Sequence, residues 1–259
     1  MHHVHRGEGK PLLLIHGLGG SSRSWDPIMD TLTTQREVIA VDLPGFGDTP
    51  PLAGEQSVAT LTDAVEAFVR DHDLDGVDVV GSSMGARMAL ELVRRGSNVG
   101  SVVALDPGGF WTQGQAKVFH ASVAASIWLV RALMGVMPTL TASAAGRTLL
   151  FAQFSAHPWR LDPEVLLTEM RTFVASPSFD AVLSNLATGP VQEGTPPGSA
   201  PGALTIGWGR QDKVTLPSQA ETALERFPDA RLHWFERCGH FPQWDVPQQA
   251  ARVILDGTA

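Results

Sequence analysis

The chain has 259 residues, of which 43% are hydrophobic and 18% are charged, and its formal net charge is −8. This composition is typical of a folded globular protein and excludes an intrinsically disordered chain. The acidic balance offers no basic surface to a phosphate backbone, so we expect no nucleic-acid partner.

The first ten residues lack the apolar stretch of a secretory signal, and Cys238 is the only cysteine. No internal disulfide can form, and nothing in the fold requires an oxidising compartment, so we expect a cytoplasmic protein. His2, His3 and His5 could chelate an ion weakly, but we interpret this stretch as a terminal strand. No cluster of histidines and carboxylates shows metal-ligand spacing, so we expect neither a metal nor another cofactor.

The first half of the chain alternates short apolar runs with longer segments whose apolar residues recur at helical spacing. This alternation is typical of βαβ units, in which helices cover a mostly parallel sheet on both faces. Because each crossover is right-handed, the loops that follow the strands share one edge of the sheet. The expected strands are residues 12–16, 38–42, 77–81 and 102–106, and the expected helices are 25–33, 61–71 and 84–95.

Residues 109–195 break this alternation and are mostly helical in pattern, with many Trp, Phe and Met residues. We interpret them as an inserted helical cap with its linker, and residues 1–108 and 196–259 as the α/β core. Residues 118–140 are apolar, but His120, Arg131 and Pro138 interrupt them. We therefore expect a buried or substrate-facing helix and no stable membrane insertion. The core resumes with expected strands at 203–208 and 232–235 and expected helices at 218–226 and 247–255.

The segment Gly81-Ser82-Ser83-Met84-Gly85 stands between an expected strand and an expected helix. A serine in such a turn is held in a strained, exposed conformation, and the flanking glycines avoid clashes where strand and helix nearly touch. We predict that Ser83 is a catalytic nucleophile. A serine that only caps the following helix is the alternative interpretation, and Ser82 lies off-centre between the glycines.

A serine nucleophile needs a base, and histidine is the side chain best matched to that task near neutral pH. His240 follows the last expected strand, on the same sheet edge as Ser83, and we predict that it is the base. A carboxylate must orient the imidazole, and Asp212 follows the expected strand 203–208. Asp106, after the preceding strand, is the competing candidate, and only the geometry of the folded chain decides between them.

Residues 16–20, His-Gly-Leu-Gly-Gly, follow the first expected strand of the core. Backbone N–H groups in such a turn can stabilise the negative charge that develops during acyl transfer. We predict that the N–H groups of Leu18 and Met84 form the oxyanion hole. Considered alone, the glycine-rich segment would be read as a tight turn only. His16 is expected to brace this loop.

Together these segments resemble the α/β-hydrolase fold superfamily, and the resemblance covers nearly the whole chain outside the cap. The motifs occur in the family's order. They are His16-Gly17-Leu18-Gly19-Gly20, Asp42-Leu43-Pro44-Gly45-Phe46-Gly47, Gly81-Ser82-Ser83-Met84-Gly85, Trp208-Gly209-Arg210-Gln211-Asp212 and Gly239-His240. The resemblance implies an α/β-hydrolase fold and a Ser-His-Asp mechanism, and it implies that the loop at 42–47 is structural.

The predicted activity is hydrolysis of a small apolar ester through an acyl-enzyme. Alternatives are carbon–carbon bond hydrolysis of the meta-cleavage type, lactone hydrolysis and acyl transfer. Pro107-Gly108-Gly109 and a tryptophan after the base are similar to the carbon–carbon bond hydrolases. A ligand-binding sensor on the same fold is the non-enzymatic alternative. The predicted partner is therefore a small apolar molecule, and the aromatic residues beside the motif loops are the candidates to bind it: Trp25, Phe110, Trp111 and Trp244.

Overall fold

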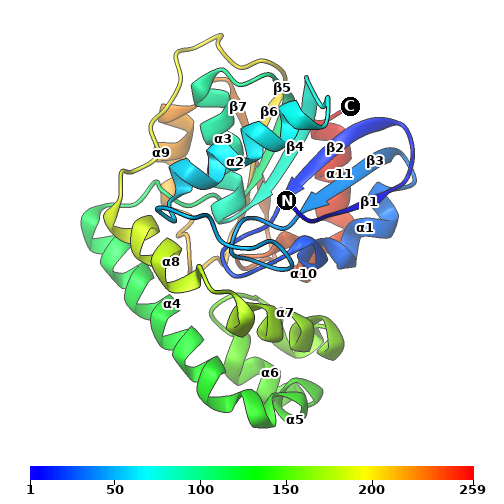
Figure 1. Ribbon diagram of the computed structural model, residues 1–259. Coiled ribbons are helices and arrows are strands. Elements are labelled where there is room, and N and C mark those ends of the chain that lie inside the picture. Colours follow the sequence, from blue (N-terminus) through cyan, green and yellow to red (C-terminus); the bar gives the residue numbers. More distant parts are fainter.

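Seven strands form one sheet in the order β1-β3-β2-β4-β5-β6-β7 (Figure 1). The computed structural model describes residues 1–259. Every neighbouring pair of strands is parallel except β1 with β3. The predicted mostly parallel α/β fold is therefore confirmed. The strands are β1 (His3–Arg6), β2 (Lys10–Ile15), β3 (Arg36–Val41), β4 (Val77–Ser82), β5 (Val99–Leu105), β6 (Leu204–Gly209) and β7 (Ala230–Phe235).

The central strands are buried on both faces, as their continuous apolar sequences indicate. In β2, Leu12, Leu13, Leu14 and Ile15 are all fully buried. Alternating side chains of a strand point to opposite faces, so Leu13 and Ile15 join one hydrophobic cluster while Leu12 and Leu14 join the other. Each face of the sheet therefore has its own core.

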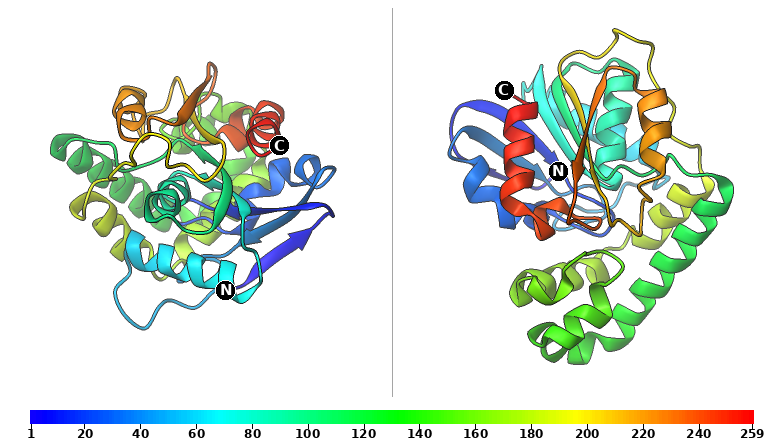
Figure 2. Two further views of the ribbon diagram at one scale, coloured as in Figure 1. Left: turned by 90° about the horizontal axis from the view of Figure 1, so that it is seen from above. Right: turned by 180° about the vertical axis from the view of Figure 1, so that it is seen from behind.

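Helices from distant parts of the chain cover these two faces (Figures 1 and 2). On the face with the larger cluster lie α2 (Val58–Asp71), α3 (Met84–Arg95) and α9 (Gln219–Arg226), and on the other lie α1 (Asp26–Leu32) and α11 (Pro247–Gly257). The short α10 (Pro242–Asp245) leads into α11. The two-sided covering follows from right-handed βαβ crossovers on either side of β2 and β4.

A helical insertion runs between β5 and β6 and forms a separate layer below the sheet in Figure 1. Its longest helix begins after Thr112, whose hydroxyl accepts a hydrogen bond from the N–H of Gln115 in a capping box. The insertion also contains two short 3-10 turns, η2 (Met134–Val136) and η3 (Pro158–Arg160), whereas a third, η1 (Ser22–Trp25), precedes α1. The helices of the insertion are α4 (Gln113–Leu133), α5 (Met137–Ala142), α6 (Ala144–Phe151), α7 (Pro163–Ala175) and α8 (Phe179–Thr188).

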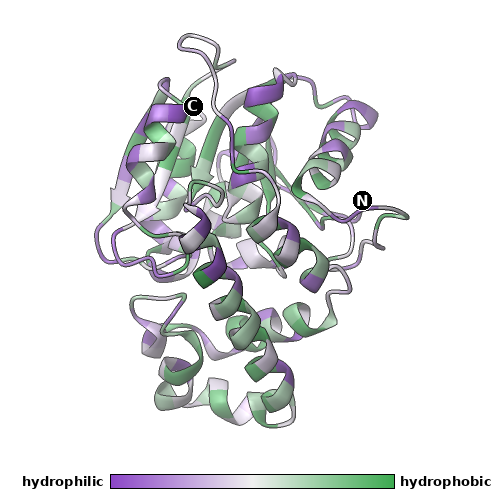
Figure 3. Ribbon diagram, turned by 90° about the vertical axis from the view of Figure 1, so that its left-hand side faces the viewer, coloured by the Kyte–Doolittle hydropathy of each residue, from purple (hydrophilic) through white to green (hydrophobic).

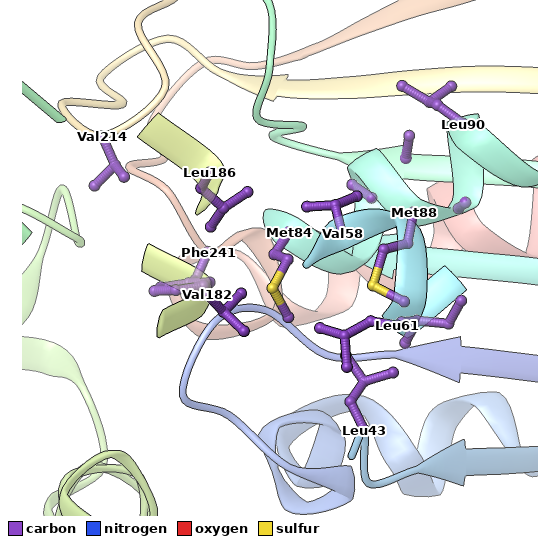
Figure 4. Close-up of a cluster of buried hydrophobic side chains, with 14 of the residues drawn as sticks. Leu43, Val58, Leu61, Met84, Met88, Leu90, Val182, Leu186, Val214 and Phe241 are labelled. Carbon is purple, nitrogen blue, oxygen red and sulfur yellow. The ribbon is translucent and has the colours of Figure 1, made fainter. Parts of the chain in front are cut away.

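The larger hydrophobic cluster extends from the sheet into the insertion, as the close-up in Figure 4 shows. Met84 at the start of α3 faces Val182 and Leu186 of α8 and the ring of Phe241. All four side chains are buried. The insertion is therefore packed against the edge of the sheet where the strand-end loops lie.

Candidate active site

Ser83 occupies the sharp turn between β4 and α3. Its backbone has φ 56° and ψ −111°, a region that non-glycine residues rarely adopt. The flanking glycines permit this turn, because a Cβ on Gly81 would lie 2.1 Å from the carbonyl oxygen of Gly85. A Cβ on Gly85 would lie 2.1 Å from the carbonyl oxygen of Ile15. The turn holds the hydroxyl of Ser83 out toward the insertion, where it lines a cavity.

Gly85→Ala should therefore destabilise the protein by about 3 kcal/mol or more, because the new methyl group overlaps the backbone of β2. Gly54→Ala is the control, since nothing lies within 4 Å of a Cβ at that position. We expect the control to remain within about 0.5 kcal/mol of the original protein. Urea unfolding of both variants measures the difference, and equal midpoints would contradict this account of the turn.

His240 lies in the loop between β7 and α10, and its side chain is buried. Nε2 is 2.8 Å from Oγ of Ser83, and Nδ1 is 2.8 Å from Oδ2 of Asp212. A carboxylate only accepts hydrogen bonds, so Nδ1–H donates to Asp212 and Nε2 accepts from the hydroxyl of Ser83. The arrangement places an unprotonated nitrogen where it can take the proton of the hydroxyl.

Asp212 lies in the loop that follows β6, and its carboxylate is held by four hydrogen bonds. Oδ1 accepts the backbone N–H groups of Val214 (2.7 Å) and Thr215 (3.1 Å). Oδ2 accepts the Thr215 hydroxyl at 2.7 Å, in addition to the imidazole of His240. Because both oxygens are fixed, the carboxylate can hold the imidazole in one tautomer and one orientation.

Asp106, the competing acid, lies beside this chain of hydrogen bonds but does not contact the imidazole. Its Oδ1 accepts the N–H of Gly209 at 2.7 Å, and its Oδ2 has no hydrogen-bond partner. Burial, followed by the nearby charge of Asp212, raises the pKa of Asp106 well above its ordinary value. Ionisation of the Asp106 side chain is therefore disfavoured.

The loop 16–20 approaches Ser83 closely, since a Cβ on Gly17 would lie 3.2 Å from Cβ of Ser83. The N–H of Leu18 donates no hydrogen bond within the protein. The N–H of Met84 belongs to the first turn of α3, where backbone donors lack helical acceptors. Both predicted donors are thus placed beside Ser83.

His16 braces this loop from behind. The N–H of Leu43 donates to Nε2 at 3.0 Å, so the ring proton is on Nδ1, which lies 2.7 Å from the carbonyl oxygen of Gly17. Burial lowers the pKa of His16 to about 4. The ring is therefore neutral near pH 7 and acts as a fixed crosslink between two loops.

Asp245 is a site residue that sequence reasoning did not identify. Its carboxylate accepts the N–H of Gly239 at 2.7 Å and the hydroxyl of Ser155 from the insertion. The backbone N–H of His240 donates to the carbonyl oxygen of Phe154 at 2.8 Å. These bonds tie the loop that carries the imidazole to the insertion. No motif signals this role, because the partners are backbone groups far away in sequence.

Asp245→Ala should lower kcat of the predicted ester hydrolysis by about tenfold to a hundredfold, because small displacements of the predicted base carry a cost of that size. Asp229→Ala is the matched control, since Asp229 also accepts two backbone N–H groups, from Gly198 and Ala200, but lies outside the cavity. Steady-state kinetics on a soluble ester compares the two variants. Equal effects on kcat would mean that Asp245 has only a general structural role.

The cavity above Ser83 is lined by 17 residues, of which 14 are hydrophobic. Its polar members are Ser83, Ser126 and His240, and none of the lining residues is Lys, Arg, Asp or Glu. Most of the wall comes from the insertion, including one face of α4. The hydrophobic members are Leu18, Phe119, Val123, Ile127, Val130, Leu150, Phe151, Phe154, Met170, Phe173, Phe179, Leu186, Val214 and Phe241.

The four aromatic residues predicted to bind substrate do not line this cavity. Trp25 is fully buried in the core beneath α1, and Phe110 packs between the rings of Trp208 and Phe227. Trp111 stacks on Phe119, which lines the cavity, with ring centroids 4.6 Å apart, but Trp111 itself is not in the cavity wall. Trp244 packs on Phe241 and lines a smaller neighbouring cavity. These four residues are near the motif loops in sequence, but their rings are not in the wall of the cavity above Ser83.

The smaller cavity contains Glu169 of α7, which faces Ser24 and the loop 16–20. Its carboxyl group is buried, and burial raises its pKa to about 7. The folded protein thus binds a proton between pH 4.5 and 7 that the unfolded chain, with the ordinary pKa of 4.5, does not. This group's contribution to stability is lost as the pH rises through that window.

Glu169→Gln should therefore stabilise the protein more at pH 8 than at pH 5, by up to about 3 kcal/mol. Glu164→Gln is the matched control, because Glu164 is an exposed carboxylate on the same helix. Urea unfolding at both pH values measures the effect. An equal stability change at pH 5 and pH 8 would contradict the raised pKa of Glu169.

Two groups of side chains place possible metal ligands within 4.8 Å of one another. One is Asp106, Asp212 and His240, of which Asp212 and His240 are hydrogen-bonded to each other as described above. The other is His2, Asp42 and Asp48, at the exposed end of the sheet. There the carboxylate of Asp42 already accepts the N–H of Ser22 at 2.6 Å and that of Asp48 at 2.9 Å.

Known proteins resemble this chain over almost its full length. It is 24% identical to 2-hydroxy-6-oxo-6-phenylhexa-2,4-dienoate hydrolase from Burkholderia cepacia, covering 96% of this chain and 88% of that protein. It is 26% identical to 2-hydroxy-6-oxononadienedioate/2-hydroxy-6-oxononatrienedioate hydrolase from Cupriavidus pinatubonensis, covering 95% and 85%.

Solved structures share the fold. A thermophilic esterase from Thermogutta terrifontis matches with a TM-score of 0.75 at 17% identity, covering 98% of this chain and 91% of that one. The enol-lactonase from Burkholderia xenovorans LB400 matches with the same TM-score at 16% identity, covering 98% and 95%. The sequence profile of the alpha/beta hydrolase family matches residues 12–253. The chain belongs to the alpha/beta hydrolase family.

Proposed function

We propose that the protein is a serine hydrolase that cleaves an uncharged, apolar carboxylic ester. Oγ of Ser83 attacks the ester carbonyl carbon while Nε2 of His240 takes the hydroxyl proton. That proton passes to the leaving alkoxide as the carbon–oxygen bond of the ester breaks, which leaves an acyl group on Ser83. Water, deprotonated by the same imidazole, then releases the acid. The N–H groups of Leu18 and Met84 stabilise the oxyanion, and Asp212 stabilises the imidazolium.

The absence of charge around the hydroxyl of Ser83 carries this proposal. Of the 17 lining residues, only Ser83, Ser126 and His240 are polar, so an apolar acyl or aryl group loses water without leaving a buried charge unpaired. The wall from α4 repeats at helical spacing through Phe119, Val123, Ile127 and Val130. This wall favours a substrate with an extended apolar group.

Carbon–carbon bond hydrolysis is the second candidate, because curated relatives have that activity in their names. Those names describe dienoates and dienedioates, which carry carboxylate groups. A buried carboxylate needs a cation or several hydrogen-bond donors beside it. The cavity wall contains no lysine or arginine, and its only polar side chains are those of Ser83, Ser126 and His240. The chemistry of the cavity therefore favours a neutral ester.

A substrate panel tests this choice. The purified protein is assayed with nitrophenyl esters of increasing acyl length, with neutral lactones, and with a dienoate of the meta-cleavage type. We expect kcat/KM to rise with acyl length until the cavity is filled, and turnover of the dienoate to be far lower. Preferential turnover of the dienoate would favour the second candidate. Binding of an apolar ligand without any product would indicate a ligand-binding sensor.

A further inference from the structure

The insertion exposes large hydrophobic side chains to an unusual degree. Most exposed hydrophobic residues on a soluble protein stand alone, whereas a contiguous group marks a surface that binds a partner or a membrane. Outside residues 113–188, which contain helices α4 to α8, only Val191 and Leu216 are exposed large hydrophobics. Within residues 113–188 there are five, here called the outer cap surface: Val118 (69% exposed), Trp128 (69%), Val136 (52%), Leu149 (72%) and Trp159 (45%).

Helix α4 supplies the centre of this surface. One of its faces lines the cavity, and the opposite face exposes Val118 and Trp128 with Ala121, Ala125 and Ala132 at helical spacing. A surface helix normally has one polar face, but both long faces of α4 are largely apolar. In Figure 3, green predominates along the helix that descends through the insertion. Length and composition alone would allow the segment Gln113–Ala142 to cross a membrane, and only 22% of its most apolar window is buried.

Helix α6 extends the surface beside α4. Gln153, which follows α6, hydrogen-bonds Ser122 and Ser126 of α4 at 2.9 Å each. Leu149 of α6 is exposed and lies four residues before Gln153 in the sequence. Val136 and Trp159 lie in the short turns η2 and η3, which contact α4 and α6 respectively. The five exposed residues therefore come from elements that are neighbours in the fold.

The charge of this segment is opposite to that of the rest of the chain. No acidic residue occurs between Asp106 and Asp162, so all 27 carboxylates and 15 of the 19 cations lie outside this stretch. The four cations within it are Lys117, Arg131, Arg147 and Arg160. Arg131 pairs with Asp180 of α8, whereas Lys117 and Arg160 have no ion pair. An acidic protein thus concentrates unpaired positive charge beside exposed apolar side chains.

We propose that the outer cap surface docks reversibly on an anionic lipid surface. Exposed Trp, Val and Leu side chains gain free energy by entering the acyl boundary, and Trp favours the interface between lipid and water. Lys117 and Arg160 are attracted to anionic headgroups. This inference goes beyond the proposed hydrolase function and does not depend on it.

Two other modes of burial fit the structure less well. In a twofold contact between copies, the surface would meet itself and bring its unpaired cations together, with no carboxylate between Asp106 and Asp162 to offset them. If α4 instead spanned the bilayer, its inner residues would leave the cavity wall above Ser83. Peripheral docking leaves the cavity intact, buries the exposed apolar side chains in lipid and places the cations beside anionic headgroups.

Co-sedimentation with vesicles tests the proposal. One set contains phosphatidylglycerol and phosphatidylcholine in equal parts, and the other contains phosphatidylcholine alone. We expect the full chain to bind the anionic vesicles more strongly, and the variant V118E/W128E to lower the partition coefficient by about tenfold or more. V191E is the matched control, since Val191 is an exposed valine that follows helix α8 and is not part of the outer cap surface, and it should bind normally. K117E/R160E should abolish the preference for anionic vesicles.

Thermal unfolding and hydrolysis of a water-soluble ester show that the variants remain folded, so failure of docking is distinguishable from failure of the proposed activity. The proposal is overturned if the original protein stays in the supernatant with both kinds of vesicle, or if V118E/W128E and V191E bind equally. Sedimentation velocity measures whether the protein is a monomer or a dimer in solution, which gives a third possible outcome. A stable dimer that V118E/W128E dissociates would identify a second copy of the chain as the occupant and overturn the proposal.

Discussion

Replacing Ser83 with alanine should lower kcat for a short nitrophenyl ester by about a millionfold, because the other hydroxyl in the cavity wall, that of Ser126, hydrogen-bonds Gln153 and not His240. The hydroxyl of Ser83 is the one that lies 2.8 Å from Nε2 of His240. Ser82→Ala is the matched control. The hydroxyl of Ser82 accepts a hydrogen bond from Gln243 at 3.2 Å, is fully buried, and does not line the cavity.

We expect Ser82→Ala to retain kcat within about tenfold, since losing a single neutral hydrogen bond changes stability by about 1 kcal/mol and leaves the nucleophile in place. Steady-state turnover of both variants, with circular dichroism to verify folding, measures the contrast. Retained activity in a folded Ser83→Ala protein would exclude the acyl-enzyme mechanism.

The second large effect separates the two candidate acids. Asp212→Asn should lower kcat by about 10⁴-fold, because an amide can donate to Nδ1 and thereby favour the wrong tautomer of His240. Asp106→Asn should change kcat little. Its carboxyl is buried, and burial and the charge of Asp212 raise its pKa, so ionisation is disfavoured and an amide of the same shape is a conservative replacement.

Kinetics of the two asparagine variants at one pH near neutrality compares them directly. Asp106 and Asp212 lie in the same buried cluster with His240, so each variant is a control for the local disturbance that the other causes. A severe loss in Asp106→Asn with full activity in Asp212→Asn would assign the acid to the loop after β5.

The sheet and the strand-end loops could be predicted because their signals are local. Short, mainly apolar runs identified β2 to β7, and Ser83, Asp212 and His240 were each predicted from a loop that directly follows a strand. Parallel strands bring such loops to one edge, so three short motifs far apart in sequence suffice to place the side chains together. The strand β1 pairs antiparallel with β3 and consists largely of polar residues, so its histidine-rich sequence gave a weaker signal.

The cavity wall could not be predicted, because it depends on how the insertion packs over the sheet. Trp25 and Phe110 stand beside motif loops in sequence, yet their rings point into the core. The spacing of Phe119, Val123 and Ile127 does mark one face of a helix. However, a helical period alone does not reveal whether that face meets protein or substrate. The contacts of Asp245 are likewise long-range and have no motif.

The most direct measurement is mass spectrometry of the protein after reaction with a fluorophosphonate, which forms a stable phosphonyl ester with an activated serine hydroxyl. Our account predicts one adduct per chain, located on the peptide that contains Ser83, and a much slower reaction in His240→Ala. A folded protein that gains no adduct, or gains it on a serine outside the turn between β4 and α3, would contradict the account.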